Sequence, residues 1–364
     1  MNRKKLLIII SFAILLVLVL QLTIFKPRNQ GLYKVTILPT LGGNFTLPHA
    51  INDNGQVAGY SEVSQGNPHL FIWDNENGIR DLGPVIGDKI SLNNAGQIAA
   101  NMIDPNGNQR AFAWDPNNGR RILPTLGGNK SRALRINDKS RIVGSAETST
   151  SVEHAFIWDD VNGIRDLTPN STVNTRAWSI NNSGQIIVFV PGGTLLVKVT
   201  KNNIMPPVPV PVRGLCTIND NGYVIGMVLK GQSKIDILTW HEKFGQKSLF
   251  LSDTGSSSLG PDFHINDSNQ VIICEGQEYI GFLEKIIPRF HYKNYLVDPK
   301  IGTISLDGYV PINMHENLVL MDINNKGCII GAIQSTKDSK SIGFLLEPIP
   351  ENMEQMRKKI NSQK

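Results

Sequence analysis

One motif recurs seven times in this 364-residue chain and constrains the fold more than any other feature. Its clearest copy reads Ala-Ile-Asn-Asp-Asn-Gly-Gln-Val-Ala-Gly over residues 50–59. The first branched residue of each copy lies at Ile51, Leu92, Ile136, Ile180, Ile218, Ile265 and Ile323. The spacing is uneven but clusters around a period of roughly 40–45 residues, which is typical of propeller blades, each a small sheet that cannot bury its faces alone. The repeat therefore predicts an all-β, seven-bladed β-propeller of four-stranded blades over residues 29–348.

A tryptophan follows the first motif residue at one constant distance in four copies, at Trp73, Trp114, Trp158 and Trp240. Each repeat can then be divided into four strands. In the first copy, strand one ends at Ile51, and strands two, three and four span Gln56–Tyr60, Leu70–Trp73 and Ile79–Leu82. The turn after the first strand ends on a residue that needs positive φ, which glycine supplies without strain. Glycine occupies this place in five copies and Asn269 also suits it, whereas Ser140 does not.

Two irregular segments extend the strand assignment. Residues 37–44 repeat the letters of residues 122–129, Ile-Leu-Pro-Thr-Leu-Gly-Gly-Asn, which finish one repeat and lead into the next. Tyr33–Leu38 is therefore expected to be a fourth strand that completes the last repeat outside Phe344–Leu346. The proline-rich segment 204–212 falls where the outer strand of the fourth repeat is expected, and proline is confined to sheet edges. The segment Gln277–His291 is expected to be an inserted surface loop. A β-solenoid is the alternative fold, which the uneven spacing disfavours.

Three repeats share a basic residue, an apolar residue, Phe and a later Trp, as in His69-Leu-Phe-Ile-Trp73, Arg110-Ala-Phe-Ala-Trp114 and His154-Ala-Phe-Ile-Trp158. With the Ile-Asn-Asp motif, these strings resemble the HAF family of predicted extracellular bacterial repeat proteins. The resemblance covers about residues 33–348 and is clearest in the first three repeats. It implies export and a repeat fold, and it supplies no agreed activity and no catalytic residues.

The N-terminal segment, residues 1–28, carries a membrane signal. Leu6–Phe25 is an apolar run interrupted by Ser11, Gln21 and Thr23, and a helix of that length spans about 30 Å, the hydrocarbon core of a bilayer. No small-residue cleavage site follows it, which favours an uncleaved anchor over a signal peptide that would leave a secreted protein. The basic residues before the run favour a cytoplasmic N-terminus with residues 29–364 on the periplasmic or extracellular side of the cell membrane.

Charge and cysteine usage restrict the partners. The formal net charge is +5, but residues 1–28 carry +5 and residues 351–364 carry +2, which leaves −2 for residues 29–350. Nucleic-acid binding, which needs a basic stripe on the folded surface, is therefore not expected. Cys216, Cys274 and Cys328 occupy different places in their repeats, so no disulfide framework is predicted. Residues 349–364 are expected to form a charged tail.

No short catalytic or cofactor-binding motif is present, so we expect no cofactor and no metal site. His69, Arg110 and His154 share one repeat position, where a basic rim could bind an anionic polymer or a carboxylate-bearing glycan. The alternative is that each simply caps its strand. The connections from strand two to strand three, near Glu62–Pro68, Asp104–Gln109 and Glu147–Glu153, are expected to form the ligand face, because they vary while the motif turns do not.

These observations favour a membrane-anchored, extracytoplasmic binding module whose ligand is a protein or a cell-envelope polysaccharide. The alternative is a propeller enzyme, a hydrolase or lyase acting on glycans, with acids that converge on the axis. The residue before each motif is expected to face that axis, and this set shows no obvious acid pair. Its members are Ala50, Ser91, Arg135, Ser179, Thr217, His264 and Asp322.

Overall fold

The computed structural model describes residues 31–362, apart from residues 65, 87–88, 201–202, 231–233, 254–261, 280–288, 308–315 and 336–339. Strands dominate this part of the chain. The strands before the third motif are β1 (Tyr33–Ile37), β2 (Gly42–Ile51), β3 (Val57–Val63), β4 (Pro68–Asp74), β5 (Gly78–Pro84), β6 (Ser91–Leu92), β7 (Ile98–Ile103), β8 (Gln109–Asp115) and β9 (Gly119–Ile122). The next two repeats contain β10 (Gly127–Ile136), β11 (Ile142–Thr148), β12 (Glu153–Asp159), β13 (Gly163–Asp166), β14 (Arg176–Ile180), β15 (Gln185–Val190), β16 (Gly193–Lys198) and β17 (Val208–Val210). The remaining elements are β18 (Arg213–Ile218), β19 (Val224–Lys230), β20 (Lys234–His241), β21 (Gly245–Asp253), β22 (Asp262–Ile265), β23 (Val271–Tyr279), β24 (Arg289–Asp298), β25 (Gly302–Ser305), β26 (Glu316–Ile323), β27 (Ile329–Ser335), β28 (Ser341–Pro348) and the helix α2 (Pro350–Asn361).

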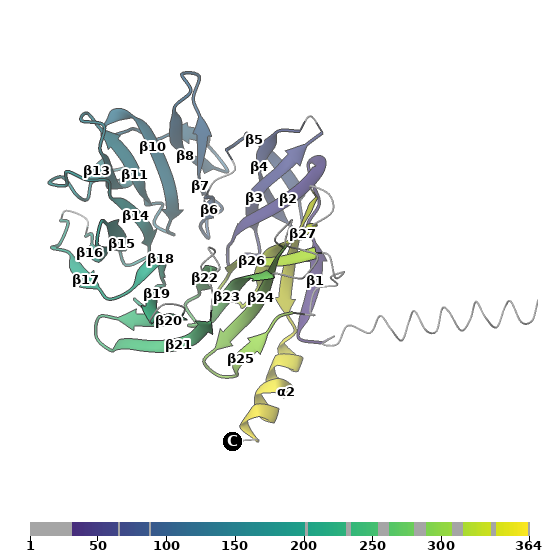
Figure 1. Ribbon diagram of the computed structural model, residues 1–364. Helices are drawn as coiled ribbons and strands as arrows, with labels where there is room; N and C mark the ends of the chain where they lie inside the picture. The colour runs from purple at the N-terminus through teal and green to yellow at the C-terminus, as the bar shows by residue number, and fades with distance from the viewer. Residues whose placement is uncertain are drawn as a thin grey trace, which may run out of the picture.

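The described strands pair into sheets built on one repeating unit of four antiparallel strands. Five sheets are single units, β6–β9, β10–β13, β14–β17, β18–β21 and β22–β25. The sixth sheet holds two units, β2–β5 and β26–β28 with β1, which meet at one parallel pair between Phe45 and Ser341. We number the units 1 to 7 in chain order, from β2–β5 to β26–β28 with β1. Figure 1 shows them arranged in sequence order around a common centre.

The motif marks the same place in every unit, the end of the first strand. In unit 1 the motif residue Ile51 ends β2 and pairs with Val57 at the start of β3. The segments expected from the sequence lie within β3, β4 and β5 except for Gln56, which precedes β3, and Val57 pairs with Trp73 in turn. All seven motif turns therefore lie on one face of the fold. Where the structure describes them, the connections from the second to the third strand lie on the opposite face.

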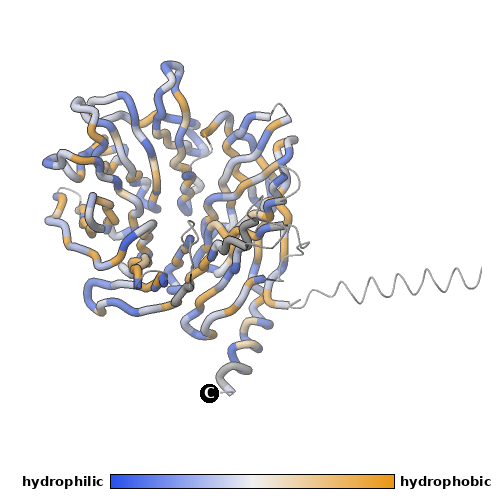
Figure 2. The backbone as a smooth tube through the Cα atoms, in the orientation of Figure 1, coloured by the Kyte–Doolittle hydropathy of each residue, from blue (hydrophilic) through white to orange (hydrophobic). Residues whose placement is uncertain are grey.

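The apolar core lies between neighbouring units rather than within one. Figure 2 shows the apolar residues alternating along the strands. The phenylalanines of the three Phe-x-Trp strings are completely buried; they are Phe71, Phe112 and Phe156. Phe156 packs with Ala99 and Ala111 of the preceding unit, and Phe71 packs with Ile330 and Leu345 of unit 7. Each unit thus buries its faces against two neighbours, and unit 1 uses unit 7 for this purpose.

The motif turns adopt the left-handed backbone that the sequence predicts. Gly55 has a φ of 77°, and the equivalent glycines and Asn269 also have positive φ. Ser140, which did not fit the pattern, adopts a φ of 56°. Its hydroxyl donates a 2.6 Å hydrogen bond to Gln97 Oε1 in unit 2. This bond between units offsets part of the backbone strain, which costs about 1–2 kcal/mol for a residue with a Cβ atom.

The outer edge of unit 4 is built from alternate prolines. β17 contains Val208 and Val210 around Pro209, and Pro209 pairs with Leu195 of β16. Proline has no N–H to donate, so this strand cannot offer a full ladder of donors to another chain. The proline-rich segment thus lies at the edge position expected from the sequence.

Unit 6 departs from the loop expected over Gln277–His291. β23 and β24 continue into this segment, where Gln277 pairs with His291 and Tyr279 pairs with Arg289. The ends of the expected loop are therefore strand, and residues 280–288 lie outside the part of the chain that the structure describes.

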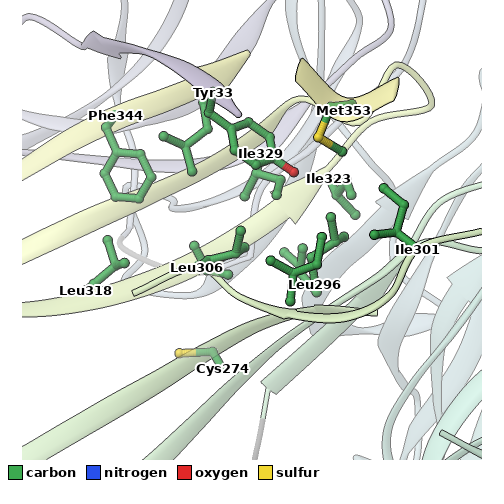
Figure 3. Packing of buried hydrophobic residues seen from close by; sticks show 14 of the residues in the cluster. Tyr33, Cys274, Leu296, Ile301, Leu306, Leu318, Ile323, Ile329, Phe344 and Met353 are labelled. Atoms are coloured by element: carbon green, nitrogen blue, oxygen red, sulfur yellow. The ribbon is translucent and has the colours of Figure 1, made fainter. Parts of the chain in front are cut away.

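The two ends of the described chain meet at unit 7. β1 pairs antiparallel with β28, and the register runs from Tyr33 opposite Pro348 to Ile37 opposite Phe344. Tyr33 and Met353 join a buried cluster between units 6 and 7, which Figure 3 shows at close range. Tyr33–Leu38 therefore supplies the outer strand of the last unit, beside the strand to which the sequence assigns it.

The chain after residue 349 is helical over Pro350–Asn361, which the sequence did not predict. Met353 of α2 is buried against the unit 7 cluster, and Met356 packs at its margin. The Ile349 N–H donates a 2.7 Å hydrogen bond to Leu32 O, which fixes the start of the helix beside β1. Glu351, Glu354 and Lys358 of the helix are exposed.

No helix within the described ranges is long and apolar enough to span a membrane. The expected anchor, Leu6–Phe25, lies outside the residues that the structure describes.

The three cysteines are free thiols. Cys216 in β18 and Cys274 in β23 are buried, and burial raises the pKa of each thiol to about 12. Neither forms a thiolate at neutral pH, so both act as small apolar core residues.

Candidate functional site

The sequence suggested His69, Arg110 and His154 as a ligand rim. In the structure, each of the two histidines contacts an aspartate of its own unit. His69 Nδ1 in β4 lies 2.9 Å from the carboxylate of Asp81 in β5. His154 Nδ1 in β12 makes the same contact with Asp166 in β13 at 2.7 Å. The His154 Nε2 atom lies 2.9 Å from Ser171 O, and the side chain is buried. Both imidazoles fasten strand three of a unit to strand four.

Arg110 occupies the equivalent place in unit 2. Its Nη2 donates a 3.0 Å hydrogen bond to Leu123 O, and its guanidinium lies 3.7 Å from the Asp104 carboxylate. Among the described residues, no hydrogen bond or ion pair joins any two of His69, Arg110 and His154. The structure therefore does not gather these three residues into one site.

The seven motif asparagines form a closed ring of hydrogen bonds around the centre. Each Nδ2 donates to the backbone carbonyl of the equivalent asparagine in the next unit at 2.8–3.1 Å. In order the ring is Asn52, Asn93, Asn137, Asn181, Asn219, Asn266 and Asn324, and the last donates to the first. Each Oδ1 accepts backbone N–H groups of its own turn, and all seven side chains are buried. The ring thus joins every unit to the next, including unit 7 to unit 1.

The following motif residue forms a second ring, nearer to solvent. Each backbone N–H donates to the side-chain Oδ1 of the next unit at 2.6–2.9 Å. In order its members are Asp53, Asn94, Asp138, Asn182, Asp220, Asp267 and Asn325. The two rings line a polar depression of about 180 Å³ on the motif face.

Acids and amides alternate around this second ring. The Nδ2 atom of Asn94 donates to Asp53 and Asp138, which flank it, and Asn182 and Asn325 bridge their neighbouring acids in the same way. Seven members cannot alternate completely, so two acids must meet once. They meet at Asp220 and Asp267.

The pKa of Asp267 reflects this junction. Burial raises its pKa above the ordinary 3.8, and the negative charges of Asp220 and Asp53 raise it further. The folded protein therefore holds this proton more tightly than the unfolded chain does. Protonation of Asp267 favours folding below pH 3.8, and that contribution is lost as the pH rises through the folded pKa.

Asp267→Asn is expected to raise the free energy of unfolding at neutral pH by about 1 kcal/mol, because removal of the partly buried like charge beside Asp220 and the new amide donor toward Asp220 outweigh the lost acceptor for Asn325 Nδ2. The gain should shrink as the pH falls through the raised pKa. Chemical denaturation of both proteins across acidic and neutral pH measures it.

Asp53→Asn is the matched control, because Asp53 accepts from amides on both sides. This variant should be destabilised by about 1 kcal/mol or more at neutral pH. Equal shifts for the two variants would contradict the junction.

A second feature, a cavity of about 30 Å³, lies among the inner strands of units 2 to 6. Arg135 of β10, His264 of β22, Asp262, Trp178 of β14 and Lys89 line it, together with Leu134, Cys216, Thr217 and Phe263. The Arg135 Nη2 lies 3.4 Å from His264 Nδ1, across the centre of the fold. The sequence placed Arg135 and His264 on strands facing the axis but did not predict that they meet.

Asp322 completes this central group. Its Oδ1 lies 3.3 Å from His264 Nδ1, and its Oδ2 accepts a 3.1 Å hydrogen bond from the Ile51 N–H. Burial would raise the pKa of Asp322, but the hydrogen bond and charge of His264 and the charge of Arg135 outweigh it and hold the pKa below its ordinary value. Asp322 is therefore a carboxylate at neutral pH that ties unit 7 to units 1 and 6.

A larger groove of about 480 Å³ opens between units 4 and 5. Trp178, Phe189, Pro191 and Met227 form its apolar surface, and Asn174, Arg176 and Gly214 complete its lining. Phe189 is 39% exposed, and it precedes the turn between β15 and β16. The groove thus lies on the face where the sequence expected ligands, but in units 4 and 5 rather than in units 1 to 3. Trp178 lines both the groove and the cavity.

The sequence held one signal for this groove. Four of the five tryptophans follow their motif at one fixed distance, and Trp178 is the fifth, just before Ile180. A large aromatic residue outside the repeat pattern has no role in the shared core, which marks it as a candidate contact. Phe189 and Met227 carry no such signal.

Within the described ranges, no group of three or more His, Cys, Asp or Glu side chains is arranged to hold a metal ion.

Comparisons with known proteins inform the fold. No protein-family model matches the chain, and no curated protein sequence matches it. Among solved structures it is similar to a puromycin hydrolase, with a TM-score of 0.51 and 12% identity over 82% of this chain and 51% of that one. The fold is a β-propeller.

Two further similarities have lower scores. A puromycin-hydrolyzing peptidase of Mycobacterium tuberculosis gives a TM-score of 0.49 and 9% identity, over 85% of this chain and 52% of the peptidase. TolB from Acinetobacter baumannii gives 0.44 and 11%, over 81% and 63%. The chain thus spans between about half and just under two thirds of the length of these three structures.

Proposed function

We propose that this chain is a seven-bladed propeller that binds a cell-envelope polysaccharide in the groove around Trp178. The seven four-stranded units, the cores between neighbours and the asparagine ring support the blade count. The strings around Phe71 and Phe156 support membership of the HAF repeat family.

The observation that carries the proposed ligand class is the composition of the groove. The Trp178, Phe189 and Met227 side chains offer an apolar platform, and Asn174 and Arg176 offer polar groups at its margin. A sugar ring has an apolar C–H face and a hydroxyl-bearing edge, so such a platform with few convergent polar groups suits it. A protein ligand is the competing outcome.

Trp178→Ala is expected to weaken polysaccharide binding at least about 10-fold, because a central aromatic contact contributes about 2 kcal/mol. The measurement is calorimetric titration of the full-length protein with purified envelope polysaccharides. Phe244→Ala is the matched control, since Phe244 is 64% exposed on the turn between β20 and β21, on the motif face. Unchanged affinity of Trp178→Ala, or binding of envelope proteins alone, would contradict the proposal.

The proposed location is the outer side of the cell membrane, with Leu6–Phe25 as an uncleaved anchor. Run length, the missing cleavage site and the basic N-terminal residues support it. N-terminal sequencing of the mature protein should recover the start of the chain. A mature protein that begins after Phe25 would make it a secreted protein instead.

A second candidate is an enzyme acting on glycans, favoured by the central cavity. His264 lies 3.3 Å from Asp322 and 4.0 Å from Asp262, so one imidazole has a carboxylate near each nitrogen. Such a group can move a proton in hydrolysis or elimination. Its test is the release of new reducing ends from a bound polysaccharide, which His264→Ala should abolish.

A further inference from the structure

The Arg135 guanidinium faces the cavity with most of its donors unassigned. A guanidinium carries five N–H donors in a planar fork. In the described part of the chain, the hydrogen-bond contact of the Arg135 side chain is the 3.4 Å approach of Nη2 to His264 Nδ1. The same Nδ1 atom lies 3.3 Å from Asp322 Oδ1, and one ring nitrogen either accepts from Arg135 or donates to Asp322, so this contact occupies at most one arginine donor. A half-buried arginine with this surplus of donors is suited to a further acceptor.

The acids nearest to Arg135 are directed to other groups. The Asp322 Oδ2 atom accepts from the Ile51 N–H at 3.1 Å, and its Oδ1 atom lies 3.3 Å from His264 Nδ1. The Asp262 Oδ1 atom accepts from the Phe263 N–H at 3.0 Å and lies 4.0 Å from His264 Nε2. No hydrogen bond or ion pair among the described residues joins Arg135 to either acid.

The cavity holds a second cation and an aromatic boundary. Lys89 lines it from the segment before β6, and Trp178 lines both this cavity and the larger groove. A cavity of about 30 Å³ is close to the volume of one water molecule in the liquid, so it accepts a small group but not a sugar ring. A ring in the groove of about 480 Å³ could therefore extend only a small substituent past Trp178 toward Arg135.

We propose that this cavity binds the carboxylate of a uronic-acid residue whose ring lies on Trp178. A planar carboxylate matches the planar arginine fork in two parallel hydrogen bonds, and a tetrahedral phosphate is larger than the cavity favours. The ligand class is then an acidic polysaccharide rather than a neutral one. This inference rests on the proposed function, which it narrows.

The experiment compares polysaccharides that differ in the carboxylate alone. The probes are polygalacturonate, alginate and hyaluronate, each paired with its carboxyl-reduced form, and a poly(glycerol phosphate). The full-length protein and its Arg135→Gln, Lys89→Gln and Trp178→Ala variants are titrated calorimetrically. Lys139→Gln is the matched control, because Lys139 is an exposed cation of the same unit on the opposite, motif face.

We expect at least one uronate to bind about 10-fold more tightly than its reduced form. Arg135→Gln should bind both forms with equal, weaker affinity, and Lys89→Gln should lose part of the preference. Trp178→Ala should weaken both forms, and Lys139→Gln should match the unaltered protein. Thermal unfolding of each variant separates lost binding from lost folding, and Lys89→Gln tests the charge preference if Arg135→Gln unfolds.

Two outcomes with the uronates overturn the inference while the proposed function stands. One is equal binding of each uronate and its reduced form. The other is a preference that survives both Arg135→Gln and Lys89→Gln. Preferential binding of the poly(glycerol phosphate) would also overturn the carboxylate assignment. If none of the polysaccharides binds, both the inference and the proposed function are wrong.

Discussion

Asn181→Asp is expected to lower the free energy of unfolding by about 3 kcal/mol, although the change replaces one NH₂ group by oxygen. Asn181 Nδ2 donates at 3.0 Å to Asn219 O in the next unit and at 2.8 Å to Gln185 Oε1. A carboxylate would place a buried negative charge against these two oxygens, and an unsatisfied buried group costs about 1–3 kcal/mol, more if charged. The measurement is chemical denaturation at neutral pH.

The neighbouring residue provides the control. Asn182 is partly exposed, and its Nδ2 bridges Asp138 and Asp220 in the outer ring. Asn182→Ala should cost less, about 1 kcal/mol, because water replaces the lost partners. If Asn181→Asp is as stable as the unaltered protein, the inner ring does not hold the units together.

Deletion of Tyr33–Leu38 is expected to lower the thermal midpoint by about 10 °C or to cause aggregation. The deletion removes β1 and the buried side chains of Tyr33 and Leu38, each worth about 2–3 kcal/mol. A loss of about 5 kcal/mol corresponds to about 10 °C in a protein of this size. It also exposes β28 as an unpaired edge. Differential scanning calorimetry and light scattering report the two effects.

A double substitution in β1 separates pairing from surface contacts. Lys34 Nζ lies 2.9 Å from the Glu347 carboxylate, and Thr36 Oγ1 lies 3.5 Å from it. Lys34→Ala with Thr36→Ala removes these contacts and retains the strand, so the midpoint should change by only about 1–2 °C. A deletion variant that melts at the temperature of the parent would show that β1 does not complete unit 7.

Local patterns were the part of the fold that the sequence could predict. The turn at Gly55 and the strand that ends at Trp73 depend on neighbouring residues and on period-two alternation, which the letters display. The prediction of an inserted loop over Gln277–His291 was wrong at both ends, because Gln277 pairs with His291 where β23 and β24 continue. An inserted loop and an extension of both strands of a hairpin can add the same number of residues, so the length of the insertion does not distinguish them.

The central contacts could not be predicted, because each joins residues far apart in the chain. The sequence shows that Asn181 and Asn219 are equivalent, but equivalence does not say that one donates to the other. Arg135 and His264 meet only because units 3 and 6 face the same centre. The helix α2 was missed because Met353 and Met356 are its main apolar signal among charged residues.

A pulling force applied at Leu32 would act next to the end of β1. In an antiparallel pair pulled from one end, hydrogen bonds open one after another, which needs little force. Here the Leu32 carbonyl is held by the Ile349 N–H, and Asn352 Nδ2 donates to Gly31 O. Met353 packs in the same cluster as Tyr33. The helix α2 thus bears the load before β1 can peel from β28, so a segment more than 300 residues away in the sequence sets the force that the start of β1 withstands.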